Sequence, residues 1–142
     1  MAVLEISTET ISRLTEHAES AYPRECCGAL VGERSGDGAV VTESLPATNV
    51  ARPATSRFEI DPGELLALHR HCRERGLDVV GYYHSHPDGS SRPSELDRRS
   101  AWPELSYLIV SVDRGGAGKL CSWRLHDDRF VSQRLLEGGG VR

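Results

Sequence analysis

Hydrophobic and polar residues alternate along the chain with two different periods, and the first of these is helical. Apolar residues recur at every third or fourth position from Ile6 to Ala21, and a proline follows two residues later. This pattern predicts a first helix over about residues 8–22, capped by Ser7 or Thr8.

A second helix is marked by the residues at its start. Asp61 is a capping carboxylate, Pro62 occupies the first helical position and Glu64 the third. An apolar stripe follows, and Gly76 stands where a left-handed residue would end the helix.

The other segments have strand periodicity and are separated by turns rich in glycine and aspartate. Residues 46–60 are predicted to form a loop that ends in a short strand at Arg57–Ile60. These elements imply an α/β fold in which a mixed, mostly antiparallel sheet is packed with helices and the C-terminal half is a meander. The predicted strands are 27–32, 39–45, 77–83, 105–112, 120–125 and 129–136.

Length and charge limit what the chain can be. Its 142 residues suit one domain, which we place at 1–137, followed by a flexible glycine-rich tail at 138–142. The net charge is −4, and only Lys119 among the 17 basic residues is a lysine, so we expect no nucleic-acid partner. No apolar run approaches the ~20 residues of a membrane span, and the N-terminus has no targeting pattern. We therefore expect a soluble, cytoplasmic protein.

The four cysteines show no paired metal-binding spacing, and the adjacent pair Cys26 and Cys27 cannot readily bridge to itself. We expect all four to be reduced, mostly buried thiols.

The stretch from His84 to Asp97 carries the candidate chemistry. If the strand at 77–83 extends to His86, its period of two puts His84 and His86 on one face. Ser94 is a good N-cap for a short helix with Asp97 at its third position, and this arrangement folds the carboxylate back towards the histidines. Two imidazoles and one carboxylate are three zinc ligands, and they leave a fourth position for water, as in catalytic sites.

Other interpretations of this stretch are weaker. Two histidines at a strand end are often satisfied by backbone groups, but that interpretation leaves Asp97 and Ser94 unexplained. A structural zinc usually has four protein ligands, commonly thiolates, and the cysteines lack the spacing for it.

Hydrolysis at such a zinc also needs a base, commonly a carboxylate that is not itself a ligand. Glu25 is the best candidate because it lies where the first helix has ended and an apolar strand begins. By spacing alone, however, a solvated charge at a helix end is the better explanation of Glu25, since glutamates at helix ends are common.

The motif His84-Ser85-His86-Pro87, six residues, Ser94, two residues, Asp97 resembles the full signature of the JAMM (MPN+) metalloproteases, also called the Mov34/MPN/PAD-1 family. The segment Pro23–Gly32 is similar to the one that carries the family's catalytic glutamate. The resemblance implies a cytidine-deaminase-like fold with zinc held by His84, His86 and Asp97. It also implies that Glu25 is the general base and that Ser94 stabilises the tetrahedral oxyanion.

The same resemblance implies a substrate class. The family cleaves amide or isopeptide bonds after the C-terminal glycine of ubiquitin-like proteins, and this short chain is most similar to the compact prokaryotic Mec+ branch. Members of that branch remove an amino acid from the Gly-Gly end of a ThiS-like sulfur-carrier protein. The alternative is a non-catalytic MPN-type scaffold, although such proteins typically lack ligands that are all present here. The sequence leaves the carrier, the leaving group and the oligomeric state open.

Overall fold

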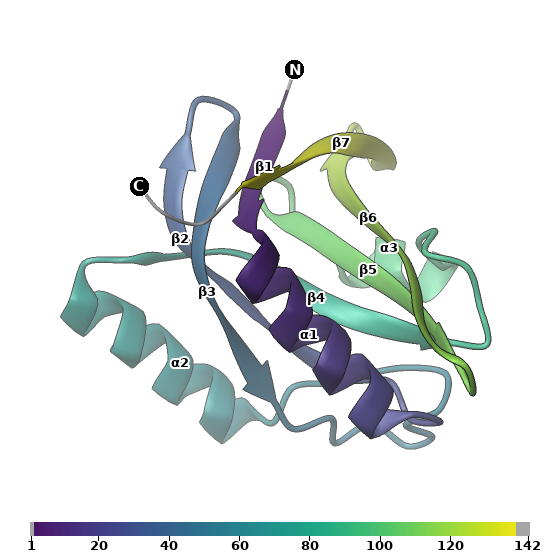
Figure 1. Ribbon diagram of the computed structural model, residues 1–142. Helices are drawn as coiled ribbons and strands as arrows, with labels where there is room; N and C mark the ends of the chain where they lie inside the picture. The colour runs from purple at the N-terminus through teal and green to yellow at the C-terminus, as the bar shows by residue number, and fades with distance from the viewer. Residues whose placement is uncertain (1, 139–142) are drawn as a thin grey trace.

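The computed structural model describes residues 2–138, which contain seven strands and three helices (Figure 1). In chain order they are β1 (Val3–Ser7), α1 (Thr8–Ala21), β2 (Cys27–Ser35), β3 (Gly38–Ala47), α2 (Pro62–Arg75), β4 (Asp78–Pro87), α3 (Glu95–Ser100), β5 (Ser106–Asp113), β6 (Gly116–His126) and β7 (Arg129–Gly138).

The strands form one mixed sheet in the order β1-β3-β2-β4-β5-β6-β7, and this sheet closes on itself as a barrel. The predicted mixed α/β fold is confirmed, and β5, β6 and β7 form the predicted antiparallel meander. Parallel pairing is more frequent than expected, because β1 runs parallel to both β3 and β7, and β4 runs parallel to β5. Closure through β1 was not predicted, since pairing between the two ends of a chain leaves no local signal.

The first helix packs on the sheet through its apolar stripe. Ser7 is its cap, with the side chain accepting a hydrogen bond from the Thr10 N–H at 3.1 Å. Leu14 and Ala18 are fully buried against β3, β5 and β6. Ile6, which we counted with the helical pattern, belongs to β1, a strand that the sequence analysis missed.

The second helix begins and ends as predicted and packs against β4. Asp61 caps it by accepting from the Glu64 N–H at 3.1 Å, and Gly76 ends it with φ 66° in the left-handed region. Leu66 of this helix is 62% exposed and faces solvent.

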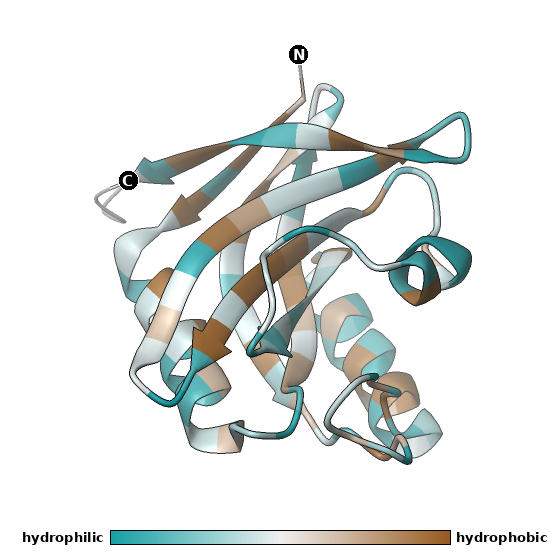
Figure 2. Ribbon diagram, turned by 90° about the vertical axis from the view of Figure 1, so that its right-hand side faces the viewer, coloured by the Kyte–Doolittle hydropathy of each residue, from teal (hydrophilic) through white to brown (hydrophobic). Residues whose placement is uncertain are grey.

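Two clusters of apolar side chains lie on opposite faces of β2 and β4. Leu30 and Val80 join the larger cluster around α1, whereas Ala29, Val31 and Val79 join the smaller one beneath α2. Figure 2 shows the hydrophobic positions as brown bands along the strands, with hairpin tips and connecting loops mostly hydrophilic. Because Tyr82 packs in the α2 cluster, the alternation of β4 places His84 and His86 on that same side.

Three boundary predictions need correction. Arg57–Ile60 does not form a strand, and only an isolated bridge joins Ile60 to Asn49. Residues 116–118, predicted as part of a turn, belong to β6. Gly138, predicted as the start of the tail, pairs with Ser7 at the end of β7, and the remaining tail residues, 139–142, lie outside the described residues.

The four cysteines are free thiols, with Cys121 only partly buried and the other three buried, as expected. Among residues 2–138, no helix has the length and apolar character needed to cross a bilayer.

Candidate active site

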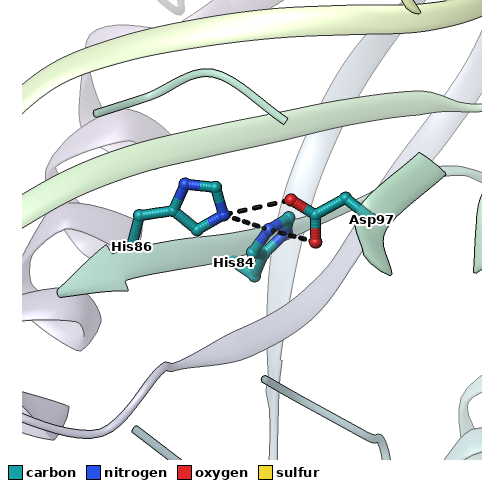
Figure 3. A group of neighbouring side chains, drawn as sticks. All are labelled: His84, His86 and Asp97. Atoms are coloured by element: carbon teal, nitrogen blue, oxygen red, sulfur yellow. Dashed lines mark hydrogen bonds and ion pairs between the residues drawn. The ribbon is translucent and has the colours of Figure 1, made fainter. Parts of the chain in front are cut away.

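Two elements bring three ligating side chains to one point (Figure 3). His84 and His86 project from the same face of β4, and their Nε2 atoms lie 3.1 Å apart. Asp97 of α3 lies against both, with Oδ1 3.1 Å from His84 Nε2 and Oδ2 3.1 Å from His86 Nε2. One ligand atom from each residue falls within 4.8 Å of the others, so the group can hold a metal ion.

The start of α3 orients the carboxylate. Ser94 is the N-cap, as predicted, and its Oγ accepts a hydrogen bond from the Asp97 N–H at 3.1 Å. In return Asp97 Oδ2 accepts from the Ser94 N–H at 2.8 Å, which completes a capping box. The hydroxyl of Ser94 accepts in this box, so its own proton is available for another partner.

The protonation of His86 favours a cation at the centre of the cluster. His86 Nδ1 lies 2.8 Å from the Ser90 carbonyl oxygen, which can only accept, so Nδ1 carries the proton. In neutral His86 the lone pair of Nε2 then points at His84 Nε2 and at the Asp97 carboxylate. Burial opposes a charge on His86, but its hydrogen bonds with Asp97 and Ser90 outweigh burial and raise its pKa. In the metal-free chain a proton is therefore shared at this point, and a bound metal ion would take its place. Two imidazole nitrogens and one carboxylate fit zinc, with the carbonyl of Ser90 as the outer partner that orients one ligand.

The environment also sets the charges that a metal ion requires. Burial opposes ionisation of Asp97, but hydrogen bonds with His84 and His86 outweigh it and hold the pKa of this carboxyl far below its ordinary range. Burial lowers the pKa of His84, which is only 1% exposed, and so favours the neutral ring. The pair therefore supplies one anionic and one neutral ligand at neutral pH.

Glu25 lies beside this cluster although it is far away in sequence. It precedes β2, and the pairing of Cys27 with His84 places the start of β2 along the histidine strand. The residue is 6% exposed, and burial raises the pKa of its carboxyl to about 7, with a smaller opposing effect of His86 and an added one of Asp97. A group with this pKa exchanges a proton readily at neutral pH.

The raised pKa of Glu25 predicts a pH-dependent cost in the metal-free protein. The folded chain holds this proton more tightly than the unfolded chain, in which the carboxyl has its ordinary pKa of 4.5. The protonated carboxyl therefore contributes fully to the unfolding free energy below pH 4.5, and this contribution is lost as the pH rises through about 7. In the presence of a chelator, Glu25→Gln should gain about 1–2 kcal/mol of unfolding free energy relative to wild type between pH 5 and pH 8, less than the full shift because some solvent access remains. Urea unfolding at both pH values measures it. An unchanged difference between the two proteins would contradict the raised pKa.

Ser85 and Phe58 are two further residues beside the site. Ser85 is fully buried on the opposite face of β4, where its Oγ accepts from the Cys26 N–H at 2.8 Å and its N–H donates to the Cys26 carbonyl at 3.2 Å. These bonds join the histidine strand to the segment of Glu25, and the direction of Ser85 is the one that the alternation of the strand predicts. Phe58 stacks on His84 with ring centroids 4.5 Å apart, a contact for which the sequence offers no signal.

A groove of about 560 Å³ leads to the cluster. His84 and Asp97 lie in its wall, and most of the remaining wall is apolar. Trp102, which also lines it, is 69% exposed. The groove can accept an extended chain segment with apolar side chains next to the cluster. Its apolar and aromatic residues are Phe58, Ile60, Leu65, Tyr82, Leu96, Trp102, Leu105 and Tyr107.

Comparisons with known proteins agree with this arrangement. Residues 7–126 match the family Prok-JAB, described as prokaryotic homologs of the JAB domain. The chain is 39% identical over 121 residues to a desampylase of Haloferax volcanii, covering 84% of this chain and 83% of the relative. It is 31% identical over 132 residues to a CysO-cysteine peptidase of Mycobacterium tuberculosis, covering 92% and 88% respectively. A solution structure of a Desulfitobacterium hafniense protein is similar at a TM-score of 0.85 and 30% identity, covering 95% of this chain and 92% of the other.

Proposed function

This chain belongs to the family of prokaryotic homologs of the JAB domain, and from that premise we propose that it is a zinc-dependent peptidase. It hydrolyses the amide bond that follows the C-terminal Gly-Gly of a ubiquitin-like or sulfur-carrier protein. The resemblance to JAMM/MPN+ proteins of the compact prokaryotic branch is confirmed, and the named relatives are peptidases. We also propose that the mixed α/β fold is the JAMM/MPN fold, which is cytidine-deaminase-like.

One observation carries the assignment: three ligating atoms converge beside a buried carboxyl whose pKa is near 7. A scaffold that only binds partners has no need of either feature, and both are costly to bury. The ligands proposed are His84, His86 and Asp97. Four free cysteines support a reducing, cytoplasmic setting for the reaction.

A zinc ion held by these ligands would polarise the scissile carbonyl and lower the pKa of a water molecule. Glu25 then takes the proton of the attacking water and passes it to the leaving amine nitrogen, which its pKa near 7 allows in both directions. The Ser94 hydroxyl donates to the oxyanion of the tetrahedral intermediate, since its proton is not used in the capping box.

The groove supports a protein tail as substrate. Its wall is largely apolar and includes His84 and Asp97, which suits an extended segment whose glycines pass over the cluster. Two of the relatives are named desampylase and CysO-cysteine peptidase. We propose a ubiquitin-like or sulfur-carrier protein as the substrate here.

The test is a cleavage panel. Zinc-loaded protein should release the added group from at least one carrier protein extended beyond Gly-Gly, either by a free amino acid or by an isopeptide-linked lysine. Intact mass spectrometry detects the loss, and chelator-treated protein should release nothing. If the zinc-loaded protein releases no group across the panel, the enzyme assignment fails and the scaffold becomes the better description.

A further inference from the structure

The loop between β3 and α2 is organised by one side chain, that of Asn49, the only asparagine in the sequence. It is 9% exposed. Its Nδ2 donates to the carbonyl oxygens of Glu25 at 2.9 Å and Arg57 at 3.0 Å, with a longer contact to that of Ala54 at 3.5 Å.

The oxygen of the same carboxamide is also used. Asn49 Oδ1 accepts from the backbone N–H groups of Ala51 at 3.0 Å and Glu59 at 3.1 Å. The donor and acceptor capacity of the side chain is therefore filled entirely by backbone groups. A buried amide with this set of partners fixes the conformation of the loop that surrounds it.

Backbone bonds extend the same connection to Glu25. The Glu25 N–H donates to the Ala54 carbonyl at 2.7 Å, while its own carbonyl accepts from Asn49. Both backbone groups of Glu25 are thus bound by the loop or by the side chain that orders the loop.

The loop also forms part of the groove. Arg57, Phe58 and Glu59 line its wall, and Phe58 stacks on His84. One carboxamide consequently binds both the backbone of Glu25 and the backbone of the groove wall.

We propose that Asn49 is a positioning residue that fixes the carboxylate of Glu25 relative to the groove in which the substrate lies. This inference rests on the proposed function, because it takes Glu25 as the general base. Proton transfer depends steeply on placement, and a displacement of about 1 Å can cost ~100-fold in rate. Loss of the Asn49 amide donors therefore lowers kcat through Glu25 and raises KM through the groove wall.

The variant that tests the proposal is Asn49→Asp, which keeps the shape and the acceptor of the side chain and removes its donors. We expect kcat to fall by about 10–100-fold and KM to rise. Zinc affinity, measured by chelator competition, should stay at the wild-type value, because the ligands come from β4 and α3. Asn49→Ser serves as the second variant if the aspartate prevents folding.

Gln133→Leu is the matched control. Gln133 is a buried amide, 4% exposed, whose oxygen accepts from the Ser122 hydroxyl at 2.7 Å between β6 and β7. It should lower stability as Asn49→Asp does and leave kcat unchanged. Equal losses of kcat in the two variants would mean that Asn49 acts only through general stability.

A double variant separates action through Glu25 from other effects. In the Glu25→Gln background, measured under single-turnover conditions, adding Asn49→Asp should change the rate by less than about twofold. A full additional 10-fold loss there would overturn the proposal.

Amide hydrogen exchange provides an outcome that does not need activity. In Asn49→Asp the Glu25 and Val50 amides should exchange faster, while the amides of β6 and β7 stay protected. If the wild-type protein cleaves no carrier, the proposed function fails, and exchange alone decides whether Asn49 holds the backbone of Glu25. Unchanged exchange at Glu25 would overturn the inference whatever the activity.

Discussion

Glu25→Gln should leave zinc bound at one ion per chain and lower kcat by about 10²- to 10⁴-fold, the range that general acid and base catalysis supplies. Glutamine has nearly the same shape as glutamate and cannot accept a proton at neutral pH. The burial that raises the pKa of Glu25 to about 7 disfavours charge at this position, so the neutral side chain is accommodated without strain. The measurements are steady-state cleavage of the carrier found in the panel and metal content after gel filtration.

The control for this variant is Glu33→Gln, which removes an exposed carboxylate from the other end of β2. It should keep full kcat. Full activity in Glu25→Gln would remove Glu25 from the mechanism, whereas loss of zinc together with activity would make it a ligand instead of a base.

Local signals in the sequence were sufficient to predict α2 and the close approach of His84, His86 and Asp97. Asp61 and Gly76 mark the two ends of the helix through their own side chain and backbone preferences, and the structure has both in those roles. The approach of His84, His86 and Asp97 depends only on the period of one strand and on the cap of the next helix. Each of these signals is local: the strand alternates with a period of two, and the Ser94 cap lies three residues from Asp97.

Interactions between segments that are distant in the sequence could not be predicted from local patterns. β1 is five residues long and is held by parallel pairing to β3 and β7, so its own pattern merged with that of α1. Arg57–Ile60 alternates like a strand, but the Asn49 carboxamide binds its backbone groups in place of a neighbouring strand. A side chain that satisfies backbone groups leaves no periodic signal.

Glu25 is another residue whose surroundings depend on segments that are distant in the sequence. Its position made it the best candidate for a base, but its spacing favoured a solvated charge, and the resemblance to a known family decided for the base. The structure supplies the physical reason, because the pairing of β2 with β4 buries this carboxyl beside the histidines and raises its pKa. Desolvation of a single group by tertiary packing cannot be seen in composition or periodicity.

Asp97→Asn should lower zinc affinity by more than the ~10–100-fold that is typical of outer-shell partners, because it removes the only anion of the ligand set. His84 and His86 would remain as two neutral ligands, too few for a catalytic zinc site. The amide oxygen of asparagine still accepts from the Ser94 N–H, so the cap of α3 is retained and the loss is confined to the cluster. Competition with a chromophoric chelator gives the affinity, and cleavage should fall with metal occupancy.

The matched variant is Glu95→Gln, which neutralises another acidic residue of α3. Glu95 is exposed and pairs with Arg98 at 2.6 Å, so its removal should change zinc affinity by less than about twofold, as expected for a surface ion pair. In the presence of chelator at neutral pH, Asp97→Asn should be the less stable of the two variants, because the hydrogen bonds that hold the pKa of Asp97 far below its ordinary range stabilise the folded, metal-free chain. Wild-type zinc affinity in Asp97→Asn would remove Asp97 from the ligand set, and the two histidines would then need a different third partner.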